Sequence, residues 1–320
     1  MAADPVAVTG ATGFVGSALC AALAGEGREV KALVRSANRA GSLPAGVEPV
    51  LGALDEEPAL AALVDGAGIV IHAAGIVAAR EPDEFDRVNA AGTARLVAAV
   101  KSAARSPRIL LISSLAARHP RLSAYAASKR AGEEIVAGSG LEHCIVRPPA
   151  VYGPGDRATL PLFRQLAGGL LLAPKIEGGR FSLLHVDDLA RLLCVLLQQP
   201  AWAGETFEPD DGRFGGYGWR DLAAIAGKAQ GKTVRCLELP RAVVWCAAVA
   251  QELAAAVTGG AAMLSRGKLG ELCYPDWVCN RESMGGAAGW APAVDFAEGF
   301  LATLAWYRRR GWIRAGNGQT

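Results

Sequence analysis

The sequence predicts an α/β protein built on a doubly wound parallel sheet, with a smaller mixed cap in the C-terminal half. Three observations carry this prediction. Short, continuously apolar runs recur through the first half of the chain, segments with helical periodicity separate them, and this alternation fades after Pro148. Apolar strands that alternate with helices indicate a parallel sheet covered on both faces. Right-handed crossovers then give the Rossmann strand order.

The predicted elements follow one another in a regular order. Strands are expected at residues 5–10, 29–35, 47–52, 69–75, 108–114 and 143–148. Helices are expected between them, because apolar residues recur at helical spacing, at residues 14–27, 56–66, 85–104 and 125–140. One more strand and helix are expected within residues 181–198.

The composition excludes several classes of protein. Hydrophobic residues make up 51% and charged residues 20% of the chain, which is typical of a well-buried globular protein and not of a disordered one. The net charge of +2 gives no basic field for nucleic acid. The 7 cysteines are scattered, with no metal-ligand spacing, so we expect reduced thiols, no metal and a cytoplasmic location. The first residues show no signal-peptide pattern.

A glycine-rich turn follows the first predicted strand and opens the first predicted helix. In the segment TGATGFVG, Gly10 allows a sharp turn, Gly13 lets the backbone approach a pyrophosphate, and Gly16 lets the helix pack close to the strand. The free N–H groups of the helix N-terminus can then bind phosphate. The alternative is a tight strand-to-helix corner without a ligand, which the later motifs disfavour. The expected dinucleotide contacts in this turn are Gly10, Thr12, Gly13, Phe14, Val15 and Gly16.

The end of the second predicted strand indicates which dinucleotide binds. An acidic residue at that position would bind the ribose hydroxyls of NAD, but the strand ends in Arg35 and Arg39 follows nearby. Guanidinium groups suit a ribose 2′-phosphate, so NADP(H) is favoured, with NAD(H) as the alternative. Arg35 could instead be a solvated strand end.

The chain is long enough for two units, because domains typically have about 150 residues. We expect an NAD(P)-binding Rossmann domain at residues 1–165, to which residues 182–200 return. Residues 166–181 and 201–320 are expected to form a substrate-binding cap.

A tyrosine and a lysine stand one helical turn apart in the segment YAASK. Lys129 follows Tyr125 at the spacing that places both side chains on one helix face. A nearby ammonium favours the phenolate and would lower the pKa of the tyrosine toward the working range of an acid or base. The preceding strand ends in Ser113 and Ser114, where a hydroxyl can bind a substrate oxygen beside the tyrosine.

The ordered combination of glycine turn, strand-terminal serine and Tyr/Lys helix resembles the extended short-chain dehydrogenase/reductases over nearly the whole chain. Further matches are HAAG at 72–75, NAAGT at 89–93, RPPAVYGPGD at 147–156, HVDDLA at 185–190 and the closing segment from 289 to 313.

The resemblance implies roles for individual residues. Ser114 would orient the substrate, with Ser113 as the alternative, Tyr125 would be the acid/base and Lys129 its electrostatic partner. Further cofactor contacts are implied at Leu54, Ala73, Ala74, Gly75, Tyr125, Lys129, Pro148 and Val151. The resemblance also implies that Asn89 lies behind the site, unless it only makes a local helix bond, and that His185 and Asp187 are structural.

The chain departs from the family pattern in its cofactor site and in its substrate site. The segment Gly52-Ala53-Leu54 lacks the aspartate that often follows the third strand, since Asp55 is displaced, and this puts an adenine contact in doubt. The family's nucleotide-sugar enzymes tend to have an asparagine before V-Y-G, where this chain has Ala150, and a longer interval before the tyrosine. These last two differences argue against a nucleotide-sugar enzyme.

Residues 241–258 would form a helix that is apolar almost all round. The prediction is a buried helix, and the alternative is a helix that lies on a membrane or lines a lipid pocket. We therefore keep peripheral membrane contact as an alternative. The sequence does not choose between a monomer and a homodimer.

Three functions stay open at this point. The first is an NADPH-dependent reductase or dehydrogenase that acts on a bulky apolar ketone or alcohol, for example a 3-keto sphingolipid or ceramide, because the cap segment 241–264 is rich in alanine and valine. The second is a nucleotide-sugar epimerase or dehydratase with bound NAD. The third is a non-catalytic nucleotide-binding subunit of a respiratory-type complex, which the Tyr125/Lys129 pair disfavours.

Overall fold

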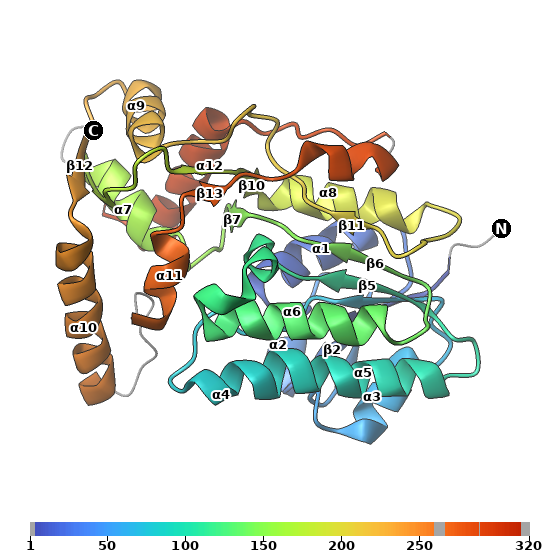
Figure 1. Cartoon of the computed structure of the whole chain (residues 1–320). Helices are drawn as coiled ribbons and strands as arrows, with labels where there is room; N and C mark the ends of the chain where they lie inside the picture. The colour runs from blue at the N-terminus through green and yellow to red at the C-terminus, as the bar shows by residue number, and fades with distance from the viewer. Residues whose placement is uncertain (1–3, 259–265, 288, 315–320) are drawn as a thin grey trace.

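The computed structural model describes residues 4–258, 266–287 and 289–314 of the chain. Its centre is a parallel sheet of seven strands in the order β11-β6-β5-β4-β1-β2-β3, which runs through the middle of Figure 1. The doubly wound Rossmann fold that the sequence predicts is confirmed. All six predicted strands are present, at β1 (Val6–Thr9), β2 (Val30–Val34), β3 (Val47–Leu51), β4 (Ile69–His72), β5 (Arg108–Ile112) and β6 (His143–Val146).

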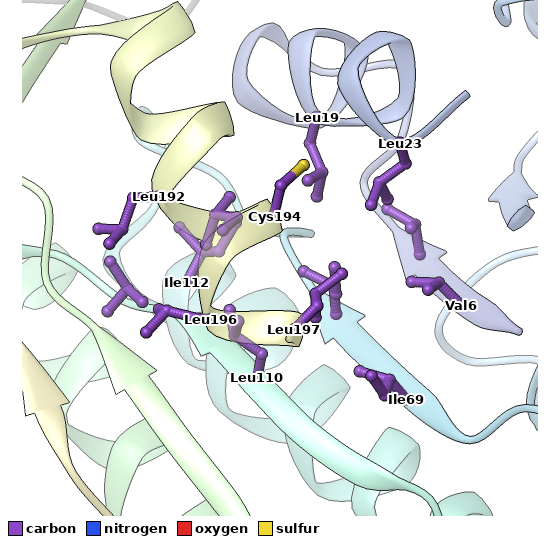
Figure 2. Close-up of a cluster of buried hydrophobic side chains, with 14 of the residues drawn as sticks. Val6, Leu19, Leu23, Ile69, Leu110, Ile112, Leu192, Cys194, Leu196 and Leu197 are labelled. Carbon is purple, nitrogen blue, oxygen red and sulfur yellow. The ribbon is translucent and has the colours of Figure 1, made fainter. Parts of the chain in front are cut away.

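Helices cover both faces of this sheet. On one face lie α1 (Phe14–Gly25) and α8 (Val186–Leu197), and Figure 2 shows side chains from both helices meeting those of β1, β4 and β5 in a buried apolar cluster. On the other face lie α3 (Glu57–Val64), α5 (Ala91–Ser102) and α6 (Ala124–Ala137). Because both faces are covered, the strands are continuously apolar, as the sequence shows.

The connections at the carboxyl edge of the sheet contain several short elements. The short helices α2 (Ala37–Ala40) and α4 (Pro82–Phe85) follow β2 and β4. A single π-helical turn, η1 (Asp86–Ala90), joins α4 to α5. The 3₁₀ turns η2 (Leu115–Arg118) and η3 (Pro120–Leu122) connect β5 to α6.

The C-terminal half forms a second layer with its own core. Its helices are α7 (Leu160–Gly168), α9 (Trp219–Ala229), α11 (Leu269–Leu272) and α12 (Phe296–Arg309), with the 3₁₀ turns η4 (Arg266–Lys268) and η5 (Arg281–Gly286). Three parallel strand pairs join β7 (Ala150–Tyr152) to β10 (Leu183–His185), β8 (Leu170–Pro174) to β12 (Arg235–Leu239) and β9 (Arg180–Phe181) to β13 (Asp276–Trp277). Aromatic side chains fill this core, and Phe163 stacks on Phe300 with ring centroids 5.2 Å apart.

One strand of the main sheet comes from the range that the sequence assigns to the cap. Strand β11 (Thr206–Phe207) lies within 201–320 but pairs in parallel with β6 at the sheet edge. The return to the Rossmann layer therefore reaches beyond residue 200. The division of the chain into two domains otherwise stays a prediction.

A buried ion network connects the two layers. The carboxylate of Glu133 accepts hydrogen bonds from two guanidinium nitrogens of Arg147, at 2.6 and 2.8 Å. Arg147 also lies 3.5 Å from Glu208, which Arg118 approaches at the same distance from the other side. Since Glu133 belongs to α6 and Glu208 follows β11, the network ties the catalytic-motif helix to the base of the cap.

Helix α10 (Arg241–Thr258) stands at the side of the molecule, drawn in brown in Figure 1. Val244 and Ala248 are buried, but Val243 and Trp245 are 47% and 49% exposed. The prediction of a buried helix is therefore wrong for most of its described side chains, and contact with a membrane stays a prediction. Residues 259–264 of the alanine- and valine-rich segment 241–264 lie outside the described residues. Among the described residues, no helix has the length and apolarity that a membrane span requires.

Candidate active site

The glycine-rich turn has the geometry of a phosphate-binding corner. Gly10 has a φ of +73°, and a Cβ there would lie 2.6 Å from the backbone of Ala73. A Cβ on Gly16 would lie 2.1 Å from the carbonyl oxygen of Gly10. Gly13 is the N-cap of α1 and has no side chain to satisfy the first N–H groups of the helix. The turn therefore presents free donors to an anion, and the residues fit a dinucleotide pyrophosphate.

Two arginines stand beside this turn. Arg39 donates a hydrogen bond from a guanidinium nitrogen to Thr12 Oγ1 at 3.4 Å, so it reaches from α2 to the glycine turn. Arg35 directly follows β2 and is exposed. Arg39 therefore reaches the glycine turn, and Arg35 follows the end of β2, where the ribose of a Rossmann-bound dinucleotide lies.

The end of β4 forms the opposite wall of this corner. Ala74 N–H donates to Thr9 Oγ1 at 3.3 Å, and a Cβ on Gly75 would lie 3.0 Å from Asn89 Oδ1. Asn89 is 4% exposed, accepts a bond from Ile76 N–H at 2.8 Å and donates to the carbonyl of Ile76 at 3.1 Å. It thus holds the loop after β4 from the π-helical turn η1. π-helical turns are frequent at functional sites.

The serine and the tyrosine of the predicted catalytic group are in contact. Both side chains line the same cavity, and hydrogen bonding by the Ser114 hydroxyl acts to lower the pKa of Tyr125. Ser113 Oγ instead donates to Glu133 Oε1 at 2.5 Å and is buried. The alternation of side chains along β5 therefore separates the two serines, so that one lies at the site and the other in the ion network.

Lys129 holds the catalytic-motif helix against the sheet. Its Nζ donates a hydrogen bond to the carbonyl oxygen of Ile112 at 2.8 Å, and it lies 3.9 Å from the Cβ position of Gly75. Burial lowers the pKa of Lys129 to about 8, and the negative charge of Glu133 opposes part of that shift. The lysine therefore sits between the tyrosine helix and the loop after β4, where the ribose of a dinucleotide would lie.

The pKa of Tyr125 moves in the opposite direction from the sequence prediction. Loss of water around the ring raises the pKa of Tyr125 to about 12, and hydrogen bonding by Ser114 opposes part of this increase. The negative charge of Glu271 adds to the increase. Lys129 is not among the groups that shift this pKa, so the expected lowering by Lys129 is wrong, and the phenol carries its proton at neutral pH. A protonated phenol is a proton donor, as ketone reduction requires.

A cavity of 460 Å³ opens beside Ser114 and Tyr125, under the cap. Its walls are mainly apolar and aromatic and come from segments far apart in the chain, including Leu162, Phe181, Leu183, Trp219, Leu272 and Trp277. The cations that line it among the described residues are Arg180 and Lys268. The cavity therefore has the character of a pocket for an apolar ligand with a small polar region.

No sequence motif marks Lys268, Glu271 and the aromatic residues of this cavity. They follow no motif of fixed spacing, and only the folding of the cap brings them next to Tyr125. The signal that was available, the abundance of aromatic residues after Pro148, points to a core as readily as to a pocket.

The remaining predicted site residues are spread along the same edge of the sheet. The carbonyl of Pro148 accepts a bond from Leu115 N–H at 2.9 Å, and Val151 pairs with Leu184 in the short β7–β10 sheet. Leu54 is half-buried, and its side chain lies 3.0 Å from the Cβ position of Gly92 in α5. Phe14 and Val15 belong to the first turn of α1. Their contacts with a cofactor stay predictions.

His185 is placed as the sequence predicts. It is the N-cap residue of α8 and accepts a hydrogen bond at Nδ1 from Asp187 N–H at 3.4 Å. The described residues contain no cluster of histidine, cysteine or acidic side chains that could hold a metal ion.

The Rossmann sheet, the glycine turn and the Ser/Tyr/Lys group together define a dinucleotide-dependent oxidoreductase. Residues 6–208 match the model of the NAD dependent epimerase/dehydratase family. The chain belongs to this family, and the resemblance to the extended short-chain dehydrogenase/reductases is confirmed. It is an NAD(P)-dependent oxidoreductase.

Comparisons with individual proteins agree with this assignment. The chain is 38% identical to a ceramide reductase of Caulobacter vibrioides over 312 residues, which cover 96% of each chain. It is 32% identical over 230 residues to a farnesyl dihydroquinoline-oxide ketoreductase of Stigmatella aurantiaca, covering 64% of this chain and 67% of that one. The fold also matches the enzyme WbmG of Bordetella bronchiseptica, solved in complex with NAD and UDP, with a TM-score of 0.73, 18% identity and 97% coverage of both chains.

Proposed function

We propose that the protein is an NADPH-dependent reductase that converts a ketone on a bulky, apolar lipid into a secondary alcohol. A 3-keto lipid of the sphingolipid or ceramide type is the concrete candidate. The observation that carries the proposal is the cavity of 460 Å³, which is lined mainly by apolar and aromatic side chains and includes both Ser114 and Tyr125 in its wall.

The charges around the cavity support a lipid over a nucleotide sugar. A nucleotide diphosphate needs cations whose N–H groups are free to bind phosphate. Arg180 uses Nε and one terminal nitrogen for the carbonyls of Gly215 and Gly216, each at 2.9 Å, and the other terminal nitrogen for Asp221 at 2.8 Å. Lys268 faces the carboxylate of Glu271 across one helical turn. Both cations that line the described cavity therefore already have an acidic partner, which offsets the attraction that each would exert on a diphosphate.

The residues of the site support a reduction by proton donation. The reduced dinucleotide, when bound, supplies a hydride to the carbonyl carbon. Ser114 donates a hydrogen bond to the carbonyl oxygen and polarises it. Tyr125 transfers its phenolic proton to that oxygen as the secondary alcohol forms. Lys129, held between Tyr125 and the ribose position, stabilises the phenolate that remains.

The choice of NADPH rests on the basic side of the glycine turn. Arg39 reaches Thr12 in the turn, Arg35 is exposed at the end of β2, and the acidic residue typical of NAD binding is missing there. A 2′-phosphate would meet two guanidinium groups at this place. The NAD in the WbmG structure belongs to a protein that shares the fold at 18% identity.

Two relatives support the substrate class. The proteins that match at 38% and 32% identity are named as reductases of a ceramide and of a farnesylated quinoline oxide. Both names describe large, apolar molecules. The exposed apolar residues of α10, which follow the cap strand β12, suit an enzyme that meets its substrate at a lipid surface.

The experiment that tests the proposal measures NADPH oxidation with a panel of ketones. The panel contains a 3-keto ceramide in mixed micelles, a short-chain ketone and a UDP-4-keto sugar, each with NADPH and with NADH. We expect turnover of the keto lipid with NADPH. Turnover restricted to the UDP-sugar, or cofactor that stays bound as NAD through purification, would overturn the proposal in favour of an epimerase or dehydratase.

A further inference from the structure

We propose that Lys268 and Glu271 form a recognition pair for the polar head of the substrate, so that the site takes an uncharged amphiphile with a hydrogen-bond donor and an acceptor beside its reacting carbonyl. This inference rests on the proposed ketone reductase function and deepens it. It assigns the specificity of the site to two cap residues that no sequence motif identifies.

The pair lies directly against the catalytic tyrosine. Lys268 is the last residue of η4, and its Nζ lies 5.5 Å from the ring centroid of Tyr125. Glu271 lies one turn further in α11, and its carboxylate accepts a hydrogen bond from the hydroxyl of Ser123, the residue before helix α6. Both side chains line the same cavity as Ser114 and Tyr125. A substrate with its carbonyl at Tyr125 therefore has its neighbouring atoms next to this pair.

The structure holds the pair in place through backbone packing. A Cβ on Gly270 would lie 2.4 Å from the carbonyl oxygen of Leu122, so α11 lies directly on the turn that leads into the Tyr125 helix. The carbonyl of Glu271 accepts a bond from Trp277 Nε1 at 2.8 Å. The acid is therefore fixed relative to Tyr125 from both ends, which is the pre-organisation that a recognition group needs.

The chemistry of the pair specifies its ligand. An ammonium has three donors and no acceptor, whereas a carboxylate only accepts. Together they match a group that both accepts and donates, such as an amide next to a hydroxyl. Their opposite charges cancel, so the pair gives no net attraction to an anion such as a diphosphate. The other walls of the described cavity are mainly apolar, which leaves this pair as the place for a polar head.

The charges of Lys268 and Glu271 are only partly solvated in the cavity. Burial lowers the pKa of Lys268 and raises that of Glu271, and each charge opposes the shift of the other. Because neither group is fully solvated, a ligand that replaces the missing water with hydrogen bonds gains more than it would at the surface. A ligand without such groups leaves the charges unsatisfied.

The test compares two ketones of equal chain length in Lys268→Met and Glu271→Gln variants. One ketone carries an amide and a hydroxyl beside the carbonyl, as in 3-keto ceramide, and the other is a plain dialkyl ketone. We expect the ratio of their kcat/KM values to fall by about 10- to 100-fold in each variant, the size of one hydrogen bond to a charged group. The matched control Lys101→Met, on the exposed end of α5, should leave the ratio unchanged. NADPH binding and thermal stability show whether each variant is folded.

Each other outcome decides against the inference or against the proposed function. An equal loss for both ketones would mean that the pair acts on Tyr125 and does not recognise the head, and an unchanged ratio would remove it from recognition altogether. If the wild-type protein reduces neither ketone, the proposed function fails. In that case the inference is tested separately by measuring how tightly the same two compounds bind to the wild type and to the two variants. Tryptophan fluorescence can report this binding, since Trp219 and Trp277 line the cavity. Equal affinity for both compounds in the wild type would overturn it.

Discussion

Lys129 donates a hydrogen bond to the carbonyl oxygen of Ile112 at 2.8 Å and so fixes helix α6, which carries Tyr125, to the end of β5. Ser114 follows the same strand by two residues, so this bond connects the two elements that carry Ser114 and Tyr125. The burial that makes it possible also lowers the pKa of Lys129 to about 8. The positioning of the site and the charge of its lysine are therefore coupled, which leads to a prediction about pH.

We expect kcat/KM for ketone reduction to be level below pH 8 and to fall above it. Lys129 is an ammonium below its pKa of about 8 and neutral above it. Tyr125 keeps its proton up to a pKa of about 12, so it does not limit the reduction in this range. The measurement is the pH profile of NADPH oxidation. The Lys129→Met variant should be slow at every pH and lack the alkaline decrease, and a decrease that persists in this variant would assign it to another group.

Tyr125→Phe should lower kcat by about 10²- to 10⁴-fold, because it removes the proton donor. NADPH affinity should stay unchanged, as measured by fluorescence titration, since the phenyl ring preserves the shape of the site. Tyr307→Phe is the matched control. Its hydroxyl donates to the carbonyl of Asp156 at 2.7 Å, and Tyr307 is not among the residues that line the described cavity, so this change should cost about 1 kcal/mol of stability and spare kcat. Full activity in Tyr125→Phe would favour the non-catalytic subunit.

Alanine substitutions of the two neighbouring serines, Ser113 and Ser114, should have different effects on activity and stability. Ser114→Ala removes the hydroxyl beside Tyr125, which also accepts a hydrogen bond from Ala116 N–H at 3.2 Å, and we expect kcat to fall by about 10²- to 10³-fold with a stability loss of about 1 kcal/mol. Ser113→Ala removes the bond to the buried carboxylate of Glu133, so it should cost about 1.5 to 3 kcal/mol in urea unfolding and leave kcat nearly intact. A reversed pattern would make Ser113 the substrate-orienting residue.

The sequence predicts the Rossmann half of this molecule well, for a physical reason. Strands buried on both faces must be continuously apolar. At positions 10 and 16 only glycine fits, because the Cβ of any other residue would collide with the backbone. Such local constraints are visible in a single sequence. The spacing of Tyr125 and Lys129 is local in the same way, because one helix carries both.

The sequence does not predict the cap or the charges that it brings to the site. Glu271 reaches Ser123 only after the chain from β9 to α11 has folded. The two residues are far apart in the sequence, so no local sequence pattern predicts their contact. Likewise, the neighbouring Lys129 suggests a lowered pKa for Tyr125, whereas the burial that raises it depends on the finished cavity. Helix α10 shows the converse, since its apolar sequence predicts burial but Trp245 is 49% exposed.

Arg35 and Arg39 should determine the preference for the phosphorylated cofactor. In the double variant Arg35→Ala/Arg39→Ala, we expect the ratio of kcat/KM with NADPH to that with NADH to fall by about 10- to 100-fold, because the charge-assisted bonds to the 2′-phosphate are lost. Arg105→Ala removes an exposed ion pair with Asp4 at 3.3 Å and should leave the ratio unchanged. A wild-type protein that uses NADH better than NADPH would contradict the assignment before any variant is made.

Arg147→Met should be strongly destabilising, because it leaves the buried carboxylate of Glu133 without its bidentate partner. The expected loss is about 3 to 5 kcal/mol in the free energy of unfolding by urea. Adding Glu133→Gln removes the uncompensated charge, so the double variant should recover most of that loss. As a control, Arg220→Met breaks the exposed pair with Glu238, in which the arginine side chain is 76% exposed, and should cost about 1 kcal/mol or less. If the double variant is no more stable than Arg147→Met, the loss comes from packing of the arginine and not from the buried charge.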